Sequence, residues 1–294
     1  MGGARASPSP LARTHRCLLA YGSRVINDMT RFRALTQLQT MPSAATICYM
    51  QLYGCDLAYI HAVAFENVAR VAAGEIVPRL ERAYVSRVLD VGCGAGPLTK
   101  ILVDAGFHVT GVDISRHLLE LARANVPVAH FVHASAYDID LRNYEAVVAV
   151  GEPLTYHPEE TDADNLVRGF FQRVSQALPA GGLLIFDVIG LGEPTLAGRS
   201  WRSGEDWAIL VETTENQSER RLVRTIETFR RVDGAYRRSH EIHQVRLFDI
   251  PALCAWLVTC GFSVETSSSY GAQQLPPRRH AFFATSKNPL SNWW

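Results

Sequence analysis

The sequence predicts a doubly wound α/β fold, in which a mostly parallel sheet of seven strands carries helices on both faces. Strand and helix patterns alternate between residues 85 and 189, and this order builds a parallel sheet. Three strand patterns then follow one another directly, which indicates an antiparallel β insertion after the fifth strand, at residues 195–248. The alternation of strands and helices therefore predicts the fold class, and the run of consecutive strands predicts the insertion.

The alternating part is expected to begin with a helix, which apolar residues at three- and four-residue steps predict over residues 56–73. Uninterrupted apolar runs, typical of strands buried on both faces, predict strands at residues 85–91, 108–114, 129–134, 144–151 and 182–189. Amphipathic patterns between them predict helices at residues 97–105, 115–125 and 162–178. Gly106 is expected to end the first of these helices, and Ser115 to cap the second.

The insertion is expected to hold strands at residues 207–214, 221–232 and 235–248. The pair Asp233-Gly234 predicts a tight hairpin turn between the last two strands. A helix follows at residues 250–260. Apolar segments at residues 262–266 and 280–285 supply the last two strands of the seven-stranded sheet.

The two ends of the chain differ from the rest. Residues 1–40 carry several arginines against the single acid Asp28, so we expect a disordered N-terminal arm. A transit peptide, or translation from a start codon set too early, is the alternative. Residues 41–84 are expected to form a helical cap, residues 85–287 the main domain, and residues 288–294 a tail.

Charge and composition argue against several classes of protein. Lysine and arginine together number 29, as do aspartate and glutamate, so no basic excess indicates nucleic acid or a membrane surface as a partner. The sequence contains no stretch of about 18 apolar residues, so it predicts no membrane-spanning helix. The six cysteines form no C-x-x-C pair and no zinc-ligand spacing, which favours buried reduced thiols, no metal site and a cytoplasmic location.

A glycine-rich loop after the first strand, Asp90-Val91-Gly92-Cys93-Gly94-Ala95-Gly96, is the most informative stretch of the chain. Glycines at a helix N-terminus let a ligand approach the backbone closely. The dinucleotide pattern G-x-G-x-x-G fails, because Pro97 or Thr99 stands where its third glycine belongs, and this argues against a nicotinamide-dependent oxidoreductase. Asp90 suits a ligand with a cationic end. Asp113, which ends the second strand, can bond both hydroxyls of a ribose or else only cap the following helix.

These features resemble the class I methyltransferases that use S-adenosylmethionine, over about residues 56–287 and most strongly over residues 88–115. The resemblance implies S-adenosylmethionine as the cofactor and sets the glycine loop against its methionine end and adenosine. Where the family often has Gly-Asp after the third strand, this chain has Ala134-Ser135, so Ser135 or the backbone N–H of Ala136 is expected to contact adenine. The cofactor-binding residues implied are Asp90, Gly92, Cys93, Gly94, Gly96, Asp113, Ile114, Ser135, Ala136 and Gly151.

The methyl acceptor site is expected beyond the carboxyl end of the fourth strand, where ligands of doubly wound sheets bind. The chain there reads Gly151-Glu152-Pro153-Leu154-Thr155-Tyr156-His157. His157 is the candidate base, because imidazole titrates near neutrality. Glu152 is expected to contact the cofactor or a cationic amine, and Tyr156 to line the acceptor pocket. A solvated loop histidine and a packing tyrosine are the structural alternatives.

Three other groups of residues are candidates of lower specificity. Tyr59, His61 and Phe65 on the first helix either form a lid over the cofactor or pack in the core. His240 and His243 lie three apart on one predicted strand and therefore on opposite faces, which argues against a metal site. The arginines of the insertion either form a solvated, ion-paired face or attract an acidic substrate; they are Arg220, Arg221, Arg224, Arg230, Arg231, Arg237 and Arg238.

The sequence thus predicts an enzyme that transfers a methyl group from S-adenosylmethionine to a nitrogen or oxygen atom of a small molecule by in-line displacement. The alternative is a catalytically silent partner subunit that binds S-adenosylmethionine, and an acceptor pocket filled by side chains would favour it. The residues after the fourth strand do not match the Asn-Pro-Pro-Tyr signature of base methylation, so nucleic acid is not expected as a partner. Insertions at this place in similar enzymes build a substrate roof or an oligomer contact, so a homodimer is one expected state.

Overall fold

The structure is a computed structural model that describes residues 52–65, 67–158 and 161–287. The expectations for the N-terminal arm, for the tail and for Cys17 and Cys48 lie outside the described residues. Among the helices of the described ranges, none combines the length and the apolar character that crossing a bilayer requires.

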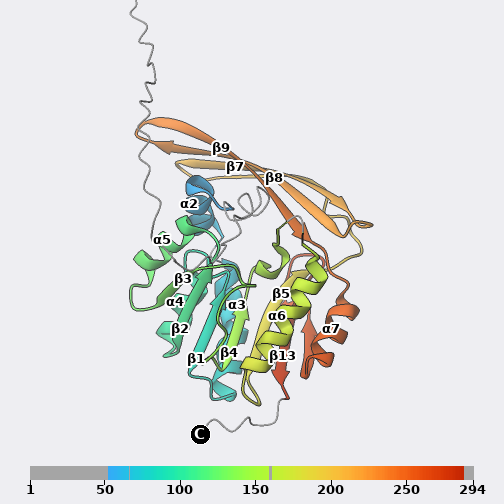
Figure 1. Cartoon of the computed structure of the whole chain (residues 1–294). Coiled ribbons are helices and arrows are strands. Elements are labelled where there is room, and N and C mark those ends of the chain that lie inside the picture. The colour runs from blue at the N-terminus through green and yellow to red at the C-terminus, as the bar shows by residue number, and fades with distance from the viewer. Residues whose placement is uncertain (1–51, 66, 159–160, 288–294) are drawn as a thin grey trace, which may run out of the picture. The chain divides into compact units, whose positions relative to one another are not determined.

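A seven-stranded sheet forms the central layer, in the order β10-β13-β5-β4-β1-β2-β3 (Figure 1). The parallel strands are β1 (Arg87–Val91), β2 (His108–Asp113), β3 (His130–His133), β4 (Ala146–Ala149) and β5 (Leu183–Ile189). β13 (Arg279–Ser286) runs antiparallel between β5 and β10 (Phe262–Ser267). The predicted mostly parallel sheet of seven strands is confirmed.

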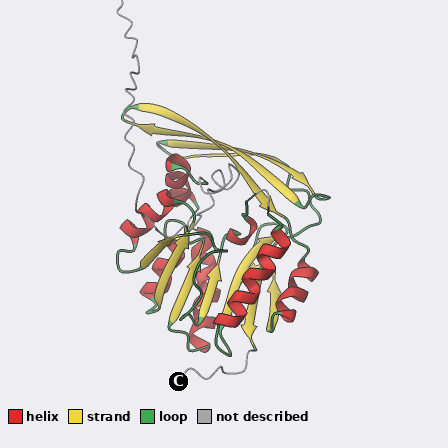
Figure 2. Ribbon diagram, viewed as in Figure 1, coloured by secondary structure: helices red, strands yellow, loops and turns green. Residues whose placement is uncertain are grey.

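Helices cover both faces of this sheet (Figure 2). α3 (Asn67–Arg82), α4 (Pro97–Asp104) and α5 (Arg116–Asn125) pack on one face, and α6 (Ala163–Ala177) and α7 (Ile250–Thr259) on the other. Aromatic rings fill the second layer, where Phe186 and Phe282 stack at 4.7 Å between centroids. Ser115 caps α5 as predicted, because its hydroxyl accepts the N–H of Leu118 at 3.2 Å.

The single helix predicted over residues 56–73 is wrong, because the chain forms two helices there, α2 (Cys55–Ala64) and α3. The break follows from packing. α2 buries Ile60 against Ile226 of the insertion, whereas α3 buries Ile76 against the parallel sheet. The two surfaces lie in different layers, so the break lets each helix bury its own apolar face.

The insertion is a four-stranded antiparallel sheet that lies across the carboxyl ends of the parallel strands (Figure 1). Its strands are β6 (Gly198–Ser203), β7 (Trp207–Asn216), β8 (Arg221–Val232) and β9 (Ala235–Arg246). Asp233 and Gly234 have φ angles of 51° and 83°, which confirms the predicted hairpin turn. β6 escaped prediction because all of its residues are exposed, so it carries no alternation of apolar and polar residues.

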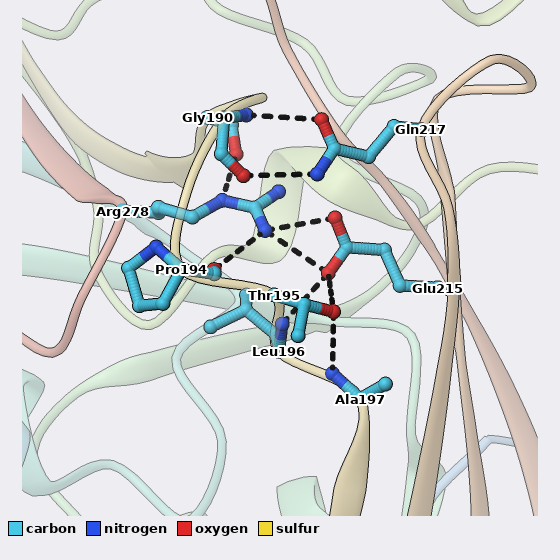
Figure 3. Close-up of polar contacts among 9 residues, drawn as sticks. Gly190, Pro194, Thr195, Leu196, Ala197, Glu215, Gln217 and Arg278 are labelled. Carbon is cyan, nitrogen blue, oxygen red and sulfur yellow. Dashed lines mark hydrogen bonds and ion pairs between the residues drawn. The ribbon is translucent and has the colours of Figure 1, made fainter.

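A buried ion pair anchors the insertion to the core (Figure 3). The guanidinium of Arg278, just before β13, donates to a carboxylate oxygen of Glu215 on β7 at 2.8 Å. The same group donates to the backbone carbonyls of Gly190 at 2.9 Å and Pro194 at 3.1 Å, where the chain leaves β5. The two charged side chains are only 4% and 2% exposed, so this contact holds β7 in a fixed place above the sheet.

Candidate active site

A cavity of about 530 Å³ lies between the carboxyl ends of the parallel strands, α2 and the inner face of the insertion sheet. Its volume is that of a small-molecule site, roughly 300–1,000 Å³. One end is lined by the glycine loop, and the other by the turn after β4 and by side chains of β7, β8 and β9. The cavity therefore joins the two regions in which the sequence predicted cofactor and acceptor sites.

Two glycines shape the loop in different ways. Gly92 has φ +68°, and a Cβ at this position would lie 2.3 Å from the Cβ of Pro153, so the turn after β4 packs directly on bare backbone. Gly94 has φ +56° and lines the cavity, and a Cβ there would meet no atom within 4 Å. The backbone at Gly94 thus faces open space that a ligand can approach.

Asp113 joins the glycine loop to the end of β2. Its carboxylate accepts the N–H of Gly94 and the N–H of Ser115, both at 2.8 Å. The side chain is buried, and burial raises the pKa of Asp113 above its ordinary value, although the two backbone donors oppose the rise. Ser115, not Asp113, caps α5, so the alternative that Asp113 serves only as a helix cap is wrong.

Asp90 presents a carboxyl group with little to compensate its charge. It is 1% exposed, and one oxygen accepts the hydroxyl of Thr99 at 2.6 Å. Burial raises the pKa of Asp90 to about 7. A cation bound in the cavity would favour the ionised form, so the site suits a ligand with a positive end.

The turn after β4 is held by a buried carboxylate of β5. Asp187 accepts the N–H of Gly151 at 2.9 Å and the N–H of Glu152 at 3.0 Å, and it also accepts the hydroxyl of Tyr270 at 3.1 Å. Glu152 adopts a left-handed conformation with φ 63°, which is costly for a residue with a side chain. Asp187 therefore fixes a turn that directs the Glu152 side chain into the cavity.

Two arginines from distant parts of the chain neutralise Glu152. Arg224 of β8 lies 2.8 Å and Arg279 of β13 lies 2.9 Å from the same carboxylate oxygen, Oε1. Burial alone would raise the pKa of Glu152, but the two guanidinium groups outweigh it and hold this pKa below its ordinary value. The other oxygen, Oε2, is buried and has no hydrogen-bond partner in the part of the chain that the structure describes.

Aromatic side chains close the same end of the cavity. The Tyr156 hydroxyl lies 3.5 Å from that of Tyr53 and accepts from Arg224 at 3.4 Å. His243 of β9 packs against both tyrosine rings in T-shaped geometry, with centroid distances of 4.9 Å to Tyr53 and 5.9 Å to Tyr156. Burial, with a smaller effect of His243, lowers the pKa of His61 to about 4, so His61 is neutral at physiological pH.

The comparisons with known proteins agree with this geometry. A family model described as a methyltransferase domain matches residues 88–182. A protein of Geobacillus sp. (strain WCH70) that is named as a methyltransferase is 27% identical over 220 residues, which cover 70% of this chain and 86% of that protein. The S-adenosylmethionine-dependent methyltransferase of Clostridium acetobutylicum ATCC 824 shares the fold, with a TM-score of 0.66 at 17% identity over 79% of this chain and 98% of its own. Residues 88–182 thus match a methyltransferase domain, and the chain shares the fold of S-adenosylmethionine-dependent methyltransferases.

A second solved methyltransferase, the sugar N-methyltransferase KedS8 from Streptoalloteichus sp. ATCC 53650, has a TM-score of 0.60 at 18% identity, over 91% of this chain and 100% of its own. The matched residues 88–182 contain the glycine loop, Asp113 and the turn after β4. The insertion sheet lies outside them. The match to a methyltransferase domain thus rests on the parallel half of the chain.

Most of the residues predicted for the site line the cavity of this methyltransferase: Asp90, Gly92, Cys93, Gly94, Asp113, Ile114, Ala136, Gly151, Glu152 and Tyr156. Gly96, Ser135 and His157 are not among the lining residues. Gly96 is the N-cap residue of α4, and the Ser135 hydroxyl accepts the N–H of Tyr137. The His157 ring lies against the carbonyl of Pro158, with Nδ1 at 3.0 Å from that oxygen.

Sequence reasoning missed several side chains of the cavity, above all Arg224, Arg279 and His243. The sequence grouped Arg224 with the exposed arginines of the insertion. On β8, however, it lies between the buried Leu222 and Ile226 and points to the same face of the strand as they do. A charged residue at an apolar position of a strand was the signal that could have found it. Among the lid candidates, His61 and Phe65 line the cavity, whereas the Tyr59 hydroxyl donates to Asp206.

The expectation of buried cysteines holds only in part among the described residues. Cys55, Cys93, Cys254 and Cys260 are free, and Cys55 is exposed rather than buried, because it begins α2 at the surface. In the described ranges, no three His, Cys, Asp or Glu residues form a group that could hold a metal ion.

Proposed function

We propose that this methyltransferase transfers the methyl group of S-adenosylmethionine to a nitrogen or oxygen atom of a small molecule. One observation carries the proposal: a single cavity runs from the glycine loop to the wall formed by Glu152, Tyr156 and His243. A cofactor at the first end and an acceptor at the second would share one enclosed space. An in-line displacement requires this arrangement, because both reactants must be aligned away from water.

The residues of the first end fit S-adenosylmethionine. The bare backbone at Gly94 faces open space, and the Asp90 carboxyl lacks a compensating cation. Asp90 and the glycine loop would hold the methionine end, and Asp113 with Ile114 would hold the ribose. Both oxygens of Asp113 accept one backbone N–H each, and a carboxylate oxygen has a further lone pair for a ribose hydroxyl. Ala136 and Gly151 would complete the cofactor contacts.

The residues of the second end would orient the acceptor. When bound, S-adenosylmethionine supplies an electrophilic methyl group. Glu152 stays ionised, because its pKa is held low by Arg224 and Arg279, and its buried Oε2 can accept an O–H or N–H of the acceptor. Burial raises the pKa of Tyr156, so its phenol keeps its proton. α2 and the insertion sheet would exclude water from the reacting atoms.

The enclosed cavity favours a small acceptor and an active enzyme. A space of about 530 Å³ between two layers of the protein suits a small molecule rather than a folded macromolecule. The sugar substrate named for KedS8 is of this size class. A silent subunit would be favoured by side chains that fill the acceptor end, whereas the cavity extends to Glu152, Tyr156 and His243 at this end.

Calorimetric titration with S-adenosylhomocysteine tests the cofactor end. We expect micromolar binding, no binding of NAD, and at least tenfold weaker binding by Asp113→Asn. Asp140→Asn is the matched control, because Asp140 is exposed and pairs with Arg142 away from the cavity. Transfer of labelled methyl groups to a library of small hydroxyl and amino compounds then tests the acceptor end. A wild-type protein that binds no S-adenosylhomocysteine would contradict the proposal.

A further inference from the structure

A histidine and a glutamate on β9 form a pair that the sequence did not suggest as functional. His243 is 1% exposed and lines the cavity, and its Nε2 lies 2.9 Å from a carboxylate oxygen of Glu241. An ionised carboxylate only accepts hydrogen bonds, so Nε2 carries the ring proton. Nδ1 then carries the lone pair of the ring.

Glu241 is itself held in place by the backbone. The N–H of Tyr53 and the N–H of Gly54 donate to its two oxygens at 2.9 and 3.0 Å, where the chain enters α2. These two donors fix the position of the carboxylate. Glu241 therefore sets both the orientation and the tautomer of the His243 ring, as carboxylates do for catalytic histidines in general.

Other charged or titratable groups also face His243 from the elements packed around it. Arg224 is its cross-strand partner on β8, Tyr53 and His61 come from the α2 side, and Tyr156 comes from the turn after η1 (Pro153–Thr155). The charge of Arg224 is matched by Glu152, and His61 is neutral at physiological pH. The two tyrosine rings pack against His243 in T-shaped geometry, and its side chain is buried from bulk water.

We propose that His243 is the general base of the methyl transfer, that Glu241 is its positioning residue, and that the acceptor is a hydroxyl group. This proposal rests on the proposed function. The acceptor oxygen forms a bond to the methyl carbon while the carbon–sulfur bond breaks and its electron pair stays on sulfur. The hydroxyl proton passes to Nδ1 of His243. The products are a methyl ether and S-adenosylhomocysteine, and the imidazolium releases its proton to water when the products leave.

The chemistry of the wall favours a hydroxyl over an amine. A neutral amine attacks through a free lone pair and loses its proton afterwards, so it gains little from a base that is held in place beforehand. A protonated amine would bring a cation close to Arg224 and Arg279. A hydroxyl must lose its single proton as it attacks, and Nδ1 of His243 would accept that proton.

His243 also replaces His157 as the base candidate. The cavity lining includes His243 but not His157. The His157 ring lies instead against the carbonyl of Pro158 and the hydroxyl of Thr161. His240 supplies a matched control for His243, because it lies on the same strand and also pairs with a glutamate, Glu227, but is exposed and lies outside the cavity lining.

Turnover of two matched probes tests the proposal. 2-Naphthol and 2-naphthylamine share one flat apolar body that suits the cavity walls, and labelled S-adenosylmethionine reports transfer to each. We expect transfer to 2-naphthol, a loss of kcat of about 100-fold or more in His243→Asn, and a KM within about threefold of wild type. The rise of the rate with pH should disappear in His243→Asn and change in Glu241→Gln. His240→Asn should match wild type.

Two results would overturn the assignment of His243 as the general base. One is a His243→Asn variant that keeps kcat within about threefold, and the other is transfer to 2-naphthylamine in preference to 2-naphthol. A measurement without turnover supplements these: nitrogen-15 spectra of the wild-type enzyme saturated with S-adenosylhomocysteine at pH 8. A proton on Nε2 of His243 supports the proposal, and a proton on Nδ1 overturns it even if neither probe reacts.

Calorimetry separates failure of the base from failure of the function. If His243→Asn binds S-adenosylhomocysteine as wild type does and still transfers methyl groups, only the base assignment fails. If wild-type protein binds no S-adenosylhomocysteine, the proposed function fails and the base assignment fails with it.

Discussion

The two ends of the cavity are built in opposite ways. The cofactor end is made of backbone and of residues close together in the sequence, since the glycine loop and Asp113 lie within residues 90–113. The acceptor end is made of side chains that come from far apart, such as Glu152 after β4, Arg224 on β8 and Arg279 on β13. The first end is set by local geometry, and the second exists only once the insertion sheet is in place.

This difference explains where the stabilising interactions lie. At the cofactor end, two backbone N–H groups donate to Asp113, and Thr99 donates to Asp90. At the acceptor end, ion pairs tie three separate elements together through Glu152. Damage to the first end should therefore change ligand binding, whereas damage to the contacts between layers should change folding first.

The largest effect is expected where the two ends touch. In Gly92→Ala the new Cβ would lie 2.3 Å from Pro153 and the backbone would keep a left-handed φ, so we expect a loss of about 3–5 kcal/mol in the free energy of unfolding. In Gly94→Ala only the φ is strained, at a cost of about 1–2 kcal/mol, but the methyl group enters the cavity and weakens S-adenosylhomocysteine binding. Urea unfolding and calorimetry separate the two variants. Equal loss of stability in both would contradict the difference.

The anchor of the insertion comes next. Glu215→Ala leaves the Arg278 guanidinium buried without its carboxylate, which should cost about 3 kcal/mol of stability. At temperatures below its midpoint of thermal unfolding, the variant should keep its affinity for the cofactor. It should lose methyl transfer, because only the acceptor end depends on the insertion. Glu212→Ala, which removes an exposed pair with Arg199, is the control. A Glu215→Ala protein with full transfer activity would show that the anchor does not position the acceptor end.

A smaller effect, of the opposite sign for stability, is expected at Asp90. Its pKa of about 7 in the folded protein lies above the unfolded value, so the cost of ionising it grows as pH rises from about 4 to 7 and is complete above 7. Asp90→Asn should therefore stabilise the ligand-free protein by about 1–3 kcal/mol at pH 8 and have no effect near pH 4. The same variant should bind S-adenosylhomocysteine more weakly. Thermal unfolding at both pH values checks the first expectation, and a destabilised variant at pH 8 would refute it.

The smallest effect is expected on the outer face of the insertion. Arg238 pairs with Glu227 but is 65% exposed, so Arg238→Ala should leave the midpoint of unfolding and ligand binding close to those of wild type. Arg224→Ala, in the neighbouring strand, should instead abolish transfer, because it strips Glu152 of a partner inside the cavity. Similar behaviour of the two variants in a transfer assay would mean that the two faces of the sheet are not functionally distinct.

The sequence predicted the parallel half well because its signals are local. A strand, a glycine loop and a capped helix each show in neighbouring residues, as at Asp90, Gly92 and Ser115. The break between α2 and α3 had no such signal, because it depends on what each helix packs against. Arg224 and His243 were hidden for the same reason. Their role depends on the cross-strand register between β8 and β9 and on which face of that sheet is covered.

The chain leaves the core for the insertion and returns to it at almost the same place. Gly190 and Phe248 form a β-bridge, and the N–H of Phe248 donates to the carbonyl of Ile189 at 2.9 Å. The segment between them starts and ends at neighbouring positions on the core. Its length and shape can therefore vary while the flanking elements stay where they are. Evolution or a protein engineer can therefore exchange the insertion sheet as one contiguous segment and keep the parallel sheet, with Glu152 and Arg279, in place.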